Sequence, residues 1–167
     1  MERLKPTTDP VVIRSHAKVI YALSKSKQAT GNYETAVSLV LPFASRQSFT
    51  TLVTALSRIA PWSTEFAHVV EKLYYKRRQE FNPREIVSIN YSLSHNGRPC
   101  DPQLSKRLAS LNCVETVTML RCYDMSDAVT PALLTSVFKK LRSIRREFNI
   151  IDLSNIIWLY LKHGYQS

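Results

Sequence analysis

Glycine is scarce in this chain of 167 residues. Only Gly31, Gly97 and Gly164 occur, whereas a β-sandwich or a β-barrel needs glycine at many tight turns. Long helices joined by short loops need few glycines. The scarcity therefore argues against an all-β fold and favours an all-α fold.

Cysteine and histidine are also few, and their spacing fits no metal site. Cys100, Cys113 and Cys122 form neither a C-x-x-C redox pair nor a zinc framework. The histidines, which show no ligand spacing either, are His16, His68, His95 and His163. We expect three reduced, mostly buried thiols in a reducing compartment, and neither a metal nor another cofactor.

Long apolar runs and catalytic motifs are missing as well. No apolar segment approaches the roughly 20 residues that cross a bilayer, so we expect no membrane span. Residues 1–6 carry no visible organellar transit signal. The chain has no glycine-rich phosphate loop and no nucleophile motif, and its carboxylates are scattered. We therefore expect no catalytic residues and no enzymatic activity.

Positive charge, in contrast, is abundant. Twenty-three Lys and Arg residues oppose 13 Asp and Glu residues, which gives a formal net charge of +10. A field of this sign attracts polyanions and raises their rate of encounter, and nucleic acid is the commonest partner of this kind. The apolar fraction of 44% is enough to form a core without disulfides or metals.

One segment of the chain is written twice at a fixed offset. The identical residues of the two copies are Arg78 and Arg145, Glu80 and Glu147, Phe81 and Phe148, Asn82 and Asn149, Ile89 and Ile156, and Gly97 and Gly164. The two residues of each pair are 67 positions apart. Helix-pair repeats usually span about 33 to 47 residues, so this offset is close to twice the length of a short repeat. The offset therefore predicts two such repeats in each copy.

Further copies of the repeat appear when segments of the chain are aligned with one another on a pair of residues, a small one followed by a bulky one. Eight positions before the bulky residue stand polar or acidic residues that can cap a helix or complement its dipole, namely Ser15, Ser48, Glu85, Asn112 and Asp152. We expect each of them to begin the first helix, A, of a repeat. The second helices, B, are predicted near residues 33–43, 63–79, 102–111 and 131–146.

These elements predict an all-α fold, an α-solenoid of about four and a half antiparallel helix-pair repeats. Residues 1–10 would form an N-terminal extension, and residues 11–167 a single helical-repeat domain. The intervals between repeats are irregular, as the bulky residues of the five copies show: Leu23, Leu56, Leu93, Leu120 and Tyr160.

Residues 148–164 (FNIIDLSNIIWLYLKHG) resemble the first helix of octotricopeptide-type repeats. Residues 81–94 are similar, although Asn90 stands where an apolar residue is expected. Related repeats occur in heptatricopeptide, FAST-kinase-like and RAP-domain proteins; no RAP domain is visible here. The resemblance implies a non-catalytic, RNA-binding α-solenoid of mitochondria, and more specifically a component of the mitochondrial ribosome that holds ribosomal RNA.

Basic residues recur at comparable places in the predicted B helices, and they are our candidates for RNA binding. They are Lys72, Lys76, Arg77, Arg78, Lys106, Arg107, Lys139, Lys140, Arg142, Arg145 and Arg146. In a solenoid these groups would line one edge and could follow phosphates. Irregular intervals favour contact with the backbone of RNA over a code of one base per repeat.

Two alternatives to this interpretation remain open. The basic residues could form an ordinary solvated helix face, in which lysines complement helix C-termini. The protein could also be a scaffold that binds other proteins in a mitochondrial assembly without contacting RNA. Among the aromatic residues, Tyr91 and Trp158 are expected to pack in the core, and Tyr74 and Tyr75 could either pack or stack on bases.

The fifth A helix, from Asp152 to about His163, has no B partner in the sequence. Its apolar residues, which wrap more than one side, are Leu153, Ile156, Ile157, Leu159, Tyr160 and Leu161. Terminal repeats normally present a polar outer face. We therefore expect another protein, or a continuation of this chain, to pack over Trp158 and Leu161. The alternative is a helix turned so that only Ile157 and Leu161 are exposed.

Overall fold

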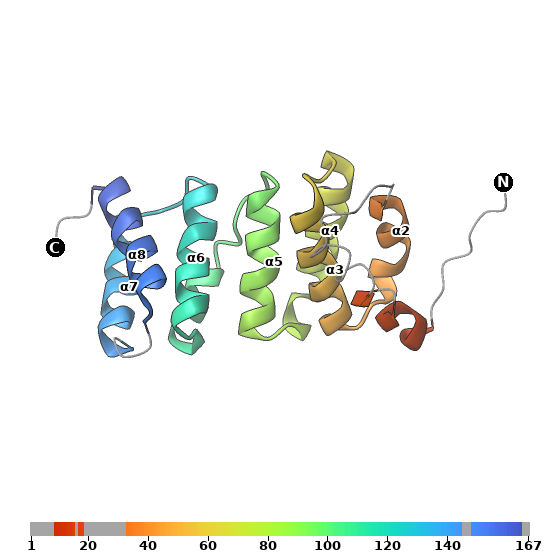
Figure 1. Cartoon of the computed structure of the whole chain (residues 1–167), viewed down its shortest axis with the longest axis horizontal. Coiled ribbons are helices and arrows are strands. Elements are labelled where there is room, and N and C mark those ends of the chain that lie inside the picture. Colours follow the sequence, from red (N-terminus) through yellow and green to blue (C-terminus); the bar gives the residue numbers. More distant parts are fainter. Residues whose placement is uncertain (1–8, 16, 19–32, 145–147, 165–167) are drawn as a thin grey trace. The chain divides into compact units, whose positions relative to one another are not determined.

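A computed structural model describes residues 9–15, 17–18, 33–144 and 148–164. Within these ranges the secondary structure is helical and contains no strand, which confirms the predicted all-α class (Figure 1). The chain divides into two compact units, residues 1–81 and residues 82–167.

Unit 1 begins with helical residues 10–15 and 17–18. It continues with α2 (Tyr33–Val40), the 3-10 helix η1 (Leu41–Phe43), α3 (Arg46–Ile59), α4 (Thr64–Arg77) and the 3-10 helix η2 (Arg78–Glu80). Its core is aromatic: the Phe81 ring lies 5.3 Å from Phe49 of α3 and 6.1 Å from Tyr74 of α4. Tyr74 is fully buried, so packing is its role, whereas the neighbouring Tyr75 is 44% exposed.

Unit 2 contains α5 (Pro83–His95), the 3-10 helix η3 (Leu104–Ser110), α6 (Cys113–Met125), α7 (Pro131–Ser143) and α8 (Ile150–Lys162). Helices α5, α6 and α8 lie side by side, and η3 contacts α5, α6 and α7 (Figure 1). The four predicted B helices correspond to α2 with η1, α4 with η2, η3, and α7. The third, predicted near residues 102–111, is a 3-10 helix over Leu104–Ser110.

Helix α8 is parallel to α6 and antiparallel to α7. At one end of the α6–α8 contact, the Cys113 thiol donates to an Asp152 carboxylate oxygen at 3.7 Å. At the other end, Lys162 Nζ donates to Asp124 Oδ1 at 2.6 Å. The Tyr160 hydroxyl, near the end of α8, donates to the carbonyl oxygen of Leu134 near the start of α7 at 2.7 Å.

Four of the five predicted helix starts were misplaced, and capping explains three of these errors. The side chains of Ser45, Asn82 and Asn149 accept hydrogen bonds from the backbone N–H groups of the third helical residues, which are Ser48, Glu85 and Asp152. Polar residues stand at both the N-cap and the third helical position, which in α5 form a full capping box, and the prediction selected the inner one. Asn112 caps α6 as predicted. Ser15 lies inside a helix that begins at Pro10 after Asp9.

The N-cap residues of six helices fall into pairs that have the same separation in the sequence as Asn82 and Asn149. Each cap in the first copy has a counterpart at the same offset in the second: Ser45 and Asn112, Ser63 and Thr130, and Asn82 and Asn149. Helices α5 and α8 are each followed by a glycine in the left-handed region, with φ of 74° at Gly97 and 63° at Gly164. Helix starts, and the stops of α5 and α8, therefore repeat across residues 45–97 and 112–164.

Buried polar groups fix the segment between α5 and η3. Asn90 is fully buried, and its Oδ1 accepts a hydrogen bond from the Asp101 backbone N–H at 2.9 Å. The Tyr123 hydroxyl accepts from the Ser105 N–H at 3.0 Å and donates to the Pro102 carbonyl oxygen at 3.2 Å. Asn90, which departs from the apolar residue of the repeat pattern, thus pairs a loop N–H group that would otherwise be buried without an acceptor.

Candidate nucleic-acid interface

Five of the predicted RNA-binding residues lie on two neighbouring elements of unit 2. We call them the η3–α7 basic surface: Lys106 and Arg107 on η3, and Lys139, Lys140 and Arg142 on α7. The two elements are in contact, and Lys140 Nζ donates to the Ala109 carbonyl oxygen at the end of η3 at 3.0 Å. Lys106, Lys139 and Arg142 are exposed, and Arg107 and Lys140 are partly exposed. The structure therefore brings residues that are distant in the sequence onto one part of unit 2.

No acidic residue occurs in η3 or α7, so the five positive charges are unopposed within these elements. The described acidic residues of unit 2 lie elsewhere. Those that are buried or hydrogen-bonded at helix starts and at the α6–α8 contact are Glu85, Asp101, Glu115, Asp124 and Asp152. Asp127, which follows α6, is exposed. A cluster of one sign next to a low-dielectric core produces a strong local field for phosphate groups.

The Asp124 carboxylate illustrates this internal use of acidic residues. Burial alone would raise its pKa, but hydrogen bonds from Lys162 and His163 outweigh burial and hold the pKa of Asp124 below its usual value. The distances from Asp124 Oδ1 are 2.6 Å to Lys162 Nζ and 2.8 Å to His163 Nε2. Asp124 therefore stays ionised and fastens the end of α8 to α6.

In unit 1 the corresponding basic cluster contains acidic residues. Across α4 and η2, four basic residues stand with three acidic ones, for a net formal charge of +1, whereas η3 and α7 together carry +5. Three of the RNA-binding candidates belong to this cluster besides Arg77: Lys72 and Lys76 are exposed, and Arg78 is partly exposed. The remaining candidates, Arg145 and Arg146, lie outside the described residues.

Arg77 has an internal role that the sequence did not reveal. Its guanidinium forms a two-pronged pair with Glu80, with N···O distances of 2.7 to 3.2 Å, and Nη1 donates to the Ala44 carbonyl oxygen at 2.8 Å. The same group lies 5.7 Å from the centre of the Phe49 ring and 5.9 Å from that of Phe81. The hydrogen bond from Arg77 is the main reason why the pKa of Glu80 is lowered. We therefore remove Arg77 from the RNA-binding candidates.

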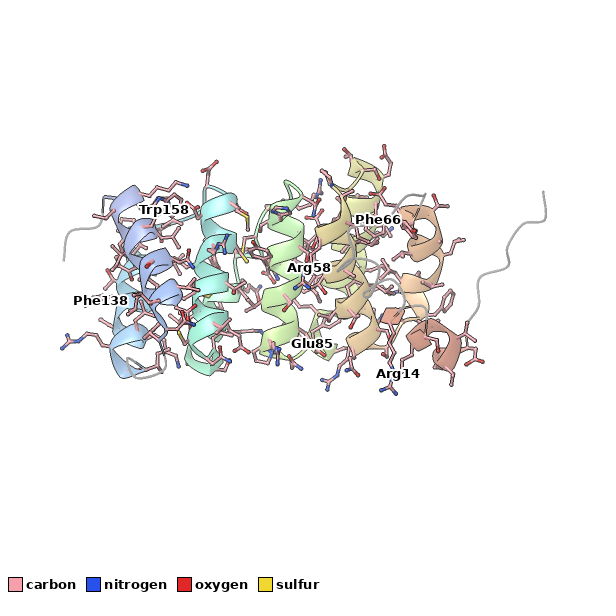
Figure 2. The ribbon with its side chains drawn as sticks, viewed as in Figure 1. Arg14, Arg58, Phe66, Glu85, Phe138 and Trp158 are labelled. Carbon is pink, nitrogen blue, oxygen red and sulfur yellow. The ribbon has the colours of Figure 1, made fainter. Side chains whose placement is uncertain are left out.

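The division of the aromatic residues into buried and exposed rings differs from the prediction. Tyr91 is half-buried, stacks on His95 and lies beneath Arg121. Trp158 is 56% exposed, so its assignment to the core was wrong. The sequence also missed Phe138, a 38% exposed ring on α7 directly before Lys139 (Figure 2).

Phe138 borders an apolar pocket between α7 and α8. Its volume is about 280 Å³, and it is lined by Phe138, Leu141, Arg142, Phe148, Leu153 and Ile156. The apolar stripe of α7 is visible in the sequence, but it does not predict the pocket. The pocket also needs residues of α8, and so depends on how α7 and α8 pack together. Because Arg142 belongs to both, the pocket adjoins the η3–α7 basic surface.

The three cysteines lie in the interior of the protein. All three are buried and free, and burial raises the pKa of the Cys122 thiol well above its usual value, so Cys122 stays protonated. Among the described residues, no group of three or more His, Cys, Asp or Glu side chains is placed to hold a metal ion. In the same part of the chain, no helix combines the length and apolar character needed to cross a membrane.

Comparison of the chain with protein-family models, with curated proteins and with solved structures finds no match. The function is therefore inferred from the residues themselves.

Proposed function

We propose that this chain is a non-catalytic RNA-binding protein that holds RNA through the η3–α7 basic surface. The observation that carries the proposal is the net charge of +5 on two contacting elements without an acidic residue. Lysine and arginine that neutralise phosphates release condensed counterions, and this term dominates RNA affinity without sequence preference. Phe138, beside Lys139, adds a ring on which an unpaired base can stack.

The proposed architecture is an α-solenoid of about four and a half antiparallel helix pairs. Its support comes from the antiparallel pair α7 and α8, from the side-by-side helices α5, α6 and α8, and from helix starts that recur at one fixed offset. In such an array, each B element presents its outer surface on the same edge. The B elements η3 and α7 of unit 2 would then present their basic residues together to a phosphate backbone.

The resemblance to octotricopeptide-type repeats favours a mitochondrial location and ribosomal RNA as the partner. Recognition of backbone and shape suits ribosomal RNA, because the intervals between repeats are too uneven for one base per repeat. The competing function is a protein scaffold without RNA contact, and one observation, the exposed apolar face of α8, favours protein binding. The exposed apolar face lies on α8, whereas Lys106 and Lys139 lie on η3 and α7, so substitutions at these positions test protein binding and RNA binding separately.

The test is the affinity of the purified chain for a fluorescently labelled single-stranded RNA, measured by anisotropy. Lys139→Glu with Arg142→Glu should weaken binding roughly tenfold or more, since two phosphate contacts become repulsive. The matched control is Lys72→Glu with Lys76→Glu, the same charge change on α4. Equal losses in both variants would contradict the assignment to η3–α7. Absence of RNA binding by the wild-type chain at low salt would favour the scaffold.

A further inference from the structure

Three helices of unit 2 can be compared position by position. Helices α5, α6 and α8 each have 13 residues, and each follows an asparagine N-cap. We compare the fourth, fifth, eighth and twelfth residues, which are Ile86, Val87, Asn90 and Ser94 in α5, Thr116, Val117, Leu120 and Asp124 in α6, and Leu153, Ser154, Ile157 and Leu161 in α8. These residues are buried in α5 and, except for the half-buried Asp124, in α6; all four are exposed in α8.

The four positions form the face on which the next helix packs. At the twelfth position of α5, the Ser94 hydroxyl accepts a hydrogen bond from Ser126, which follows α6, at 3.2 Å. At the twelfth position of α6, Asp124 accepts from Lys162 of α8. The same face of α8 is bare: the exposed fractions are 45% for Leu153, 57% for Ile157 and 74% for Leu161. The alternative prediction, that only Ile157 and Leu161 would be exposed, is therefore wrong.

The face of α8 is also more apolar than its counterparts. Asn90 and Ser94 of α5 correspond to Ile157 and Leu161 of α8, and Ile150, at the first position, is 79% exposed. We call Ile150, Leu153, Ile157 and Leu161 the α8 stripe. Trp158 corresponds to Tyr91 of α5 and Arg121 of α6, and so lies beside the stripe. A contiguous apolar stripe of this kind marks a protein contact.

We propose that the α8 stripe binds a second copy of this chain, with the two α8 helices antiparallel and Ile157 of each copy on a two-fold axis. The stripe suits this symmetry, because Leu153 and Leu161 lie four positions before and four positions after Ile157. Antiparallel pairing therefore places Leu161 of one copy against Leu153 of the other. Contacts of this kind are self-complementary, as a closed two-fold dimer requires.

The two ends of the stripe have complementary shapes. Leu153 lines the 280 Å³ pocket between α7 and α8, whereas Leu161, at the other end, is more exposed than Leu153 or Ile157. In the antiparallel arrangement each copy places its Leu161 at the mouth of the other copy's pocket. Two such insertions are formed at once, with Ile157 between them. A buried apolar side chain in a pocket is the arrangement that dominates interface energies.

Charge also favours self-association at this face over the rest of the surface. Each copy carries +10, so two copies repel one another over most approaches. The charged side chains of α8 are Asp152, which is buried beside Cys113, and Lys162, which is paired with Asp124. The α8 stripe itself carries no charge, and the cationic side chains nearest to it are Arg142, which lines the pocket, and Lys162, which is paired with Asp124. Salt, which screens the remaining long-range repulsion, should strengthen the dimer, whereas salt weakens RNA binding.

The first experiment measures the mass of the RNA-free chain in solution over a concentration series by sedimentation or light scattering. We expect a dimer whose dissociation constant falls as salt is raised. Ile157→Glu and Leu161→Glu should each raise that constant roughly tenfold or more, because a charge is then buried at the contact. Ile151→Glu is the matched control, since Ile151 is 68% exposed on the same helix but off the stripe. A wild-type monomer throughout the series, or equal effects of Ile151→Glu and Ile157→Glu, would overturn the proposal.

The second experiment tests the two-fold axis by disulfide formation. Helices that pack about 8–10 Å apart bring facing Cα atoms to about 4–5 Å, which is within disulfide range. Ile157→Cys should therefore form a covalent dimer on mild oxidation, and Ile151→Cys should not; the native cysteines are buried. Leu153→Cys with Leu161→Cys should also cross-link, whereas Leu161→Cys alone should remain monomeric under denaturing conditions. Efficient cross-linking of Leu161→Cys alone would contradict the antiparallel arrangement. Neither experiment contains RNA, so their outcome is independent of the proposed function.

Discussion

Helices α4 and α7 begin at equivalent places in the two copies of the repeated segment and bury the same four positions, yet their outer faces differ. The buried pairs are Phe66 and Leu133, Ala67 and Leu134, Val70 and Val137, and Tyr74 and Leu141. Outside this stripe, Arg77 corresponds to Ile144, Tyr75 to Arg142 and Glu71 to Phe138. Core positions are constrained by packing, whereas outer positions are free to differ. The two copies therefore share a core pattern but differ in surface charge, which is nearly balanced on α4 and positive on α7.

Arg77→Ala should produce the largest loss of stability. The substitution removes the ion pair with Glu80 and leaves the Ala44 carbonyl without the charged donor, so we expect a loss of about 2–3 kcal/mol. Chemical denaturation followed by circular dichroism measures it. Arg142→Ala on α7 is the comparison, because Arg142 is exposed; it should cost less than about 0.5 kcal/mol. If both variants lost the same stability, the contrast between α4 and α7 would be wrong.

Asn90→Leu should be the next largest effect, and it compares α5 with α8. The variant leaves the buried Asp101 N–H without its acceptor, so we expect a loss of about 1–3 kcal/mol. Ile157→Asn, at the corresponding position of α8, should leave the stability of the monomer nearly unchanged, because Ile157 is exposed. The free energy of unfolding of both variants, measured below the concentration at which the chain self-associates, tests this difference. A fully stable Asn90→Leu variant would remove the role assigned to the buried amide.

The contact between α6 and α8 should be sensitive to acid. The pKa of Asp124 is lower in the folded chain than in the unfolded chain, so its contribution to stability is present above the unfolded value, near 3.9. That contribution is lost as the pH falls through the lower folded pKa. In Asp124→Asn this part of the acid dependence should disappear, with a loss of about 1 kcal/mol at neutral pH. Parallel acid-unfolding curves of wild type and variant would contradict this prediction.

Asp127→Gly should have the smallest effect, and it should stabilise the chain. Asp127 follows the end of α6 with φ of 49°, at the place where glycine follows α5 and α8. Glycine adopts this conformation without strain, so we expect a gain of about 0.5 kcal/mol. Thermal unfolding measures the gain. A lower midpoint in the variant would mean that the Asp127 side chain has a stabilising role of its own.

The sequence was sufficient to predict the helices but not the use of their outer faces. Glycine and proline in the preceding loops located all four B elements within a few residues, because these residues interrupt one helix or begin the next. The starts of α3, α5 and α8 were misplaced because polar residues occur at both the N-cap and the third helical position. Arg77 and Trp158 were misjudged for a different reason: the pattern of one helix does not reveal what packs beside it. The internal pair of Arg77 and the exposure of Trp158 depend on contacts between elements.

The most direct test of the RNA-binding surface is lysine footprinting of the wild-type chain. Lysines are acetylated with and without single-stranded RNA, and the modified sites are quantified by mass spectrometry. We expect RNA to protect Lys106 and Lys139 on the η3–α7 basic surface, and to leave Lys72 and Lys76 on α4 nearly as reactive as before. Protection of Lys72 and Lys76 with continued reactivity of Lys106 and Lys139 would contradict the proposed surface.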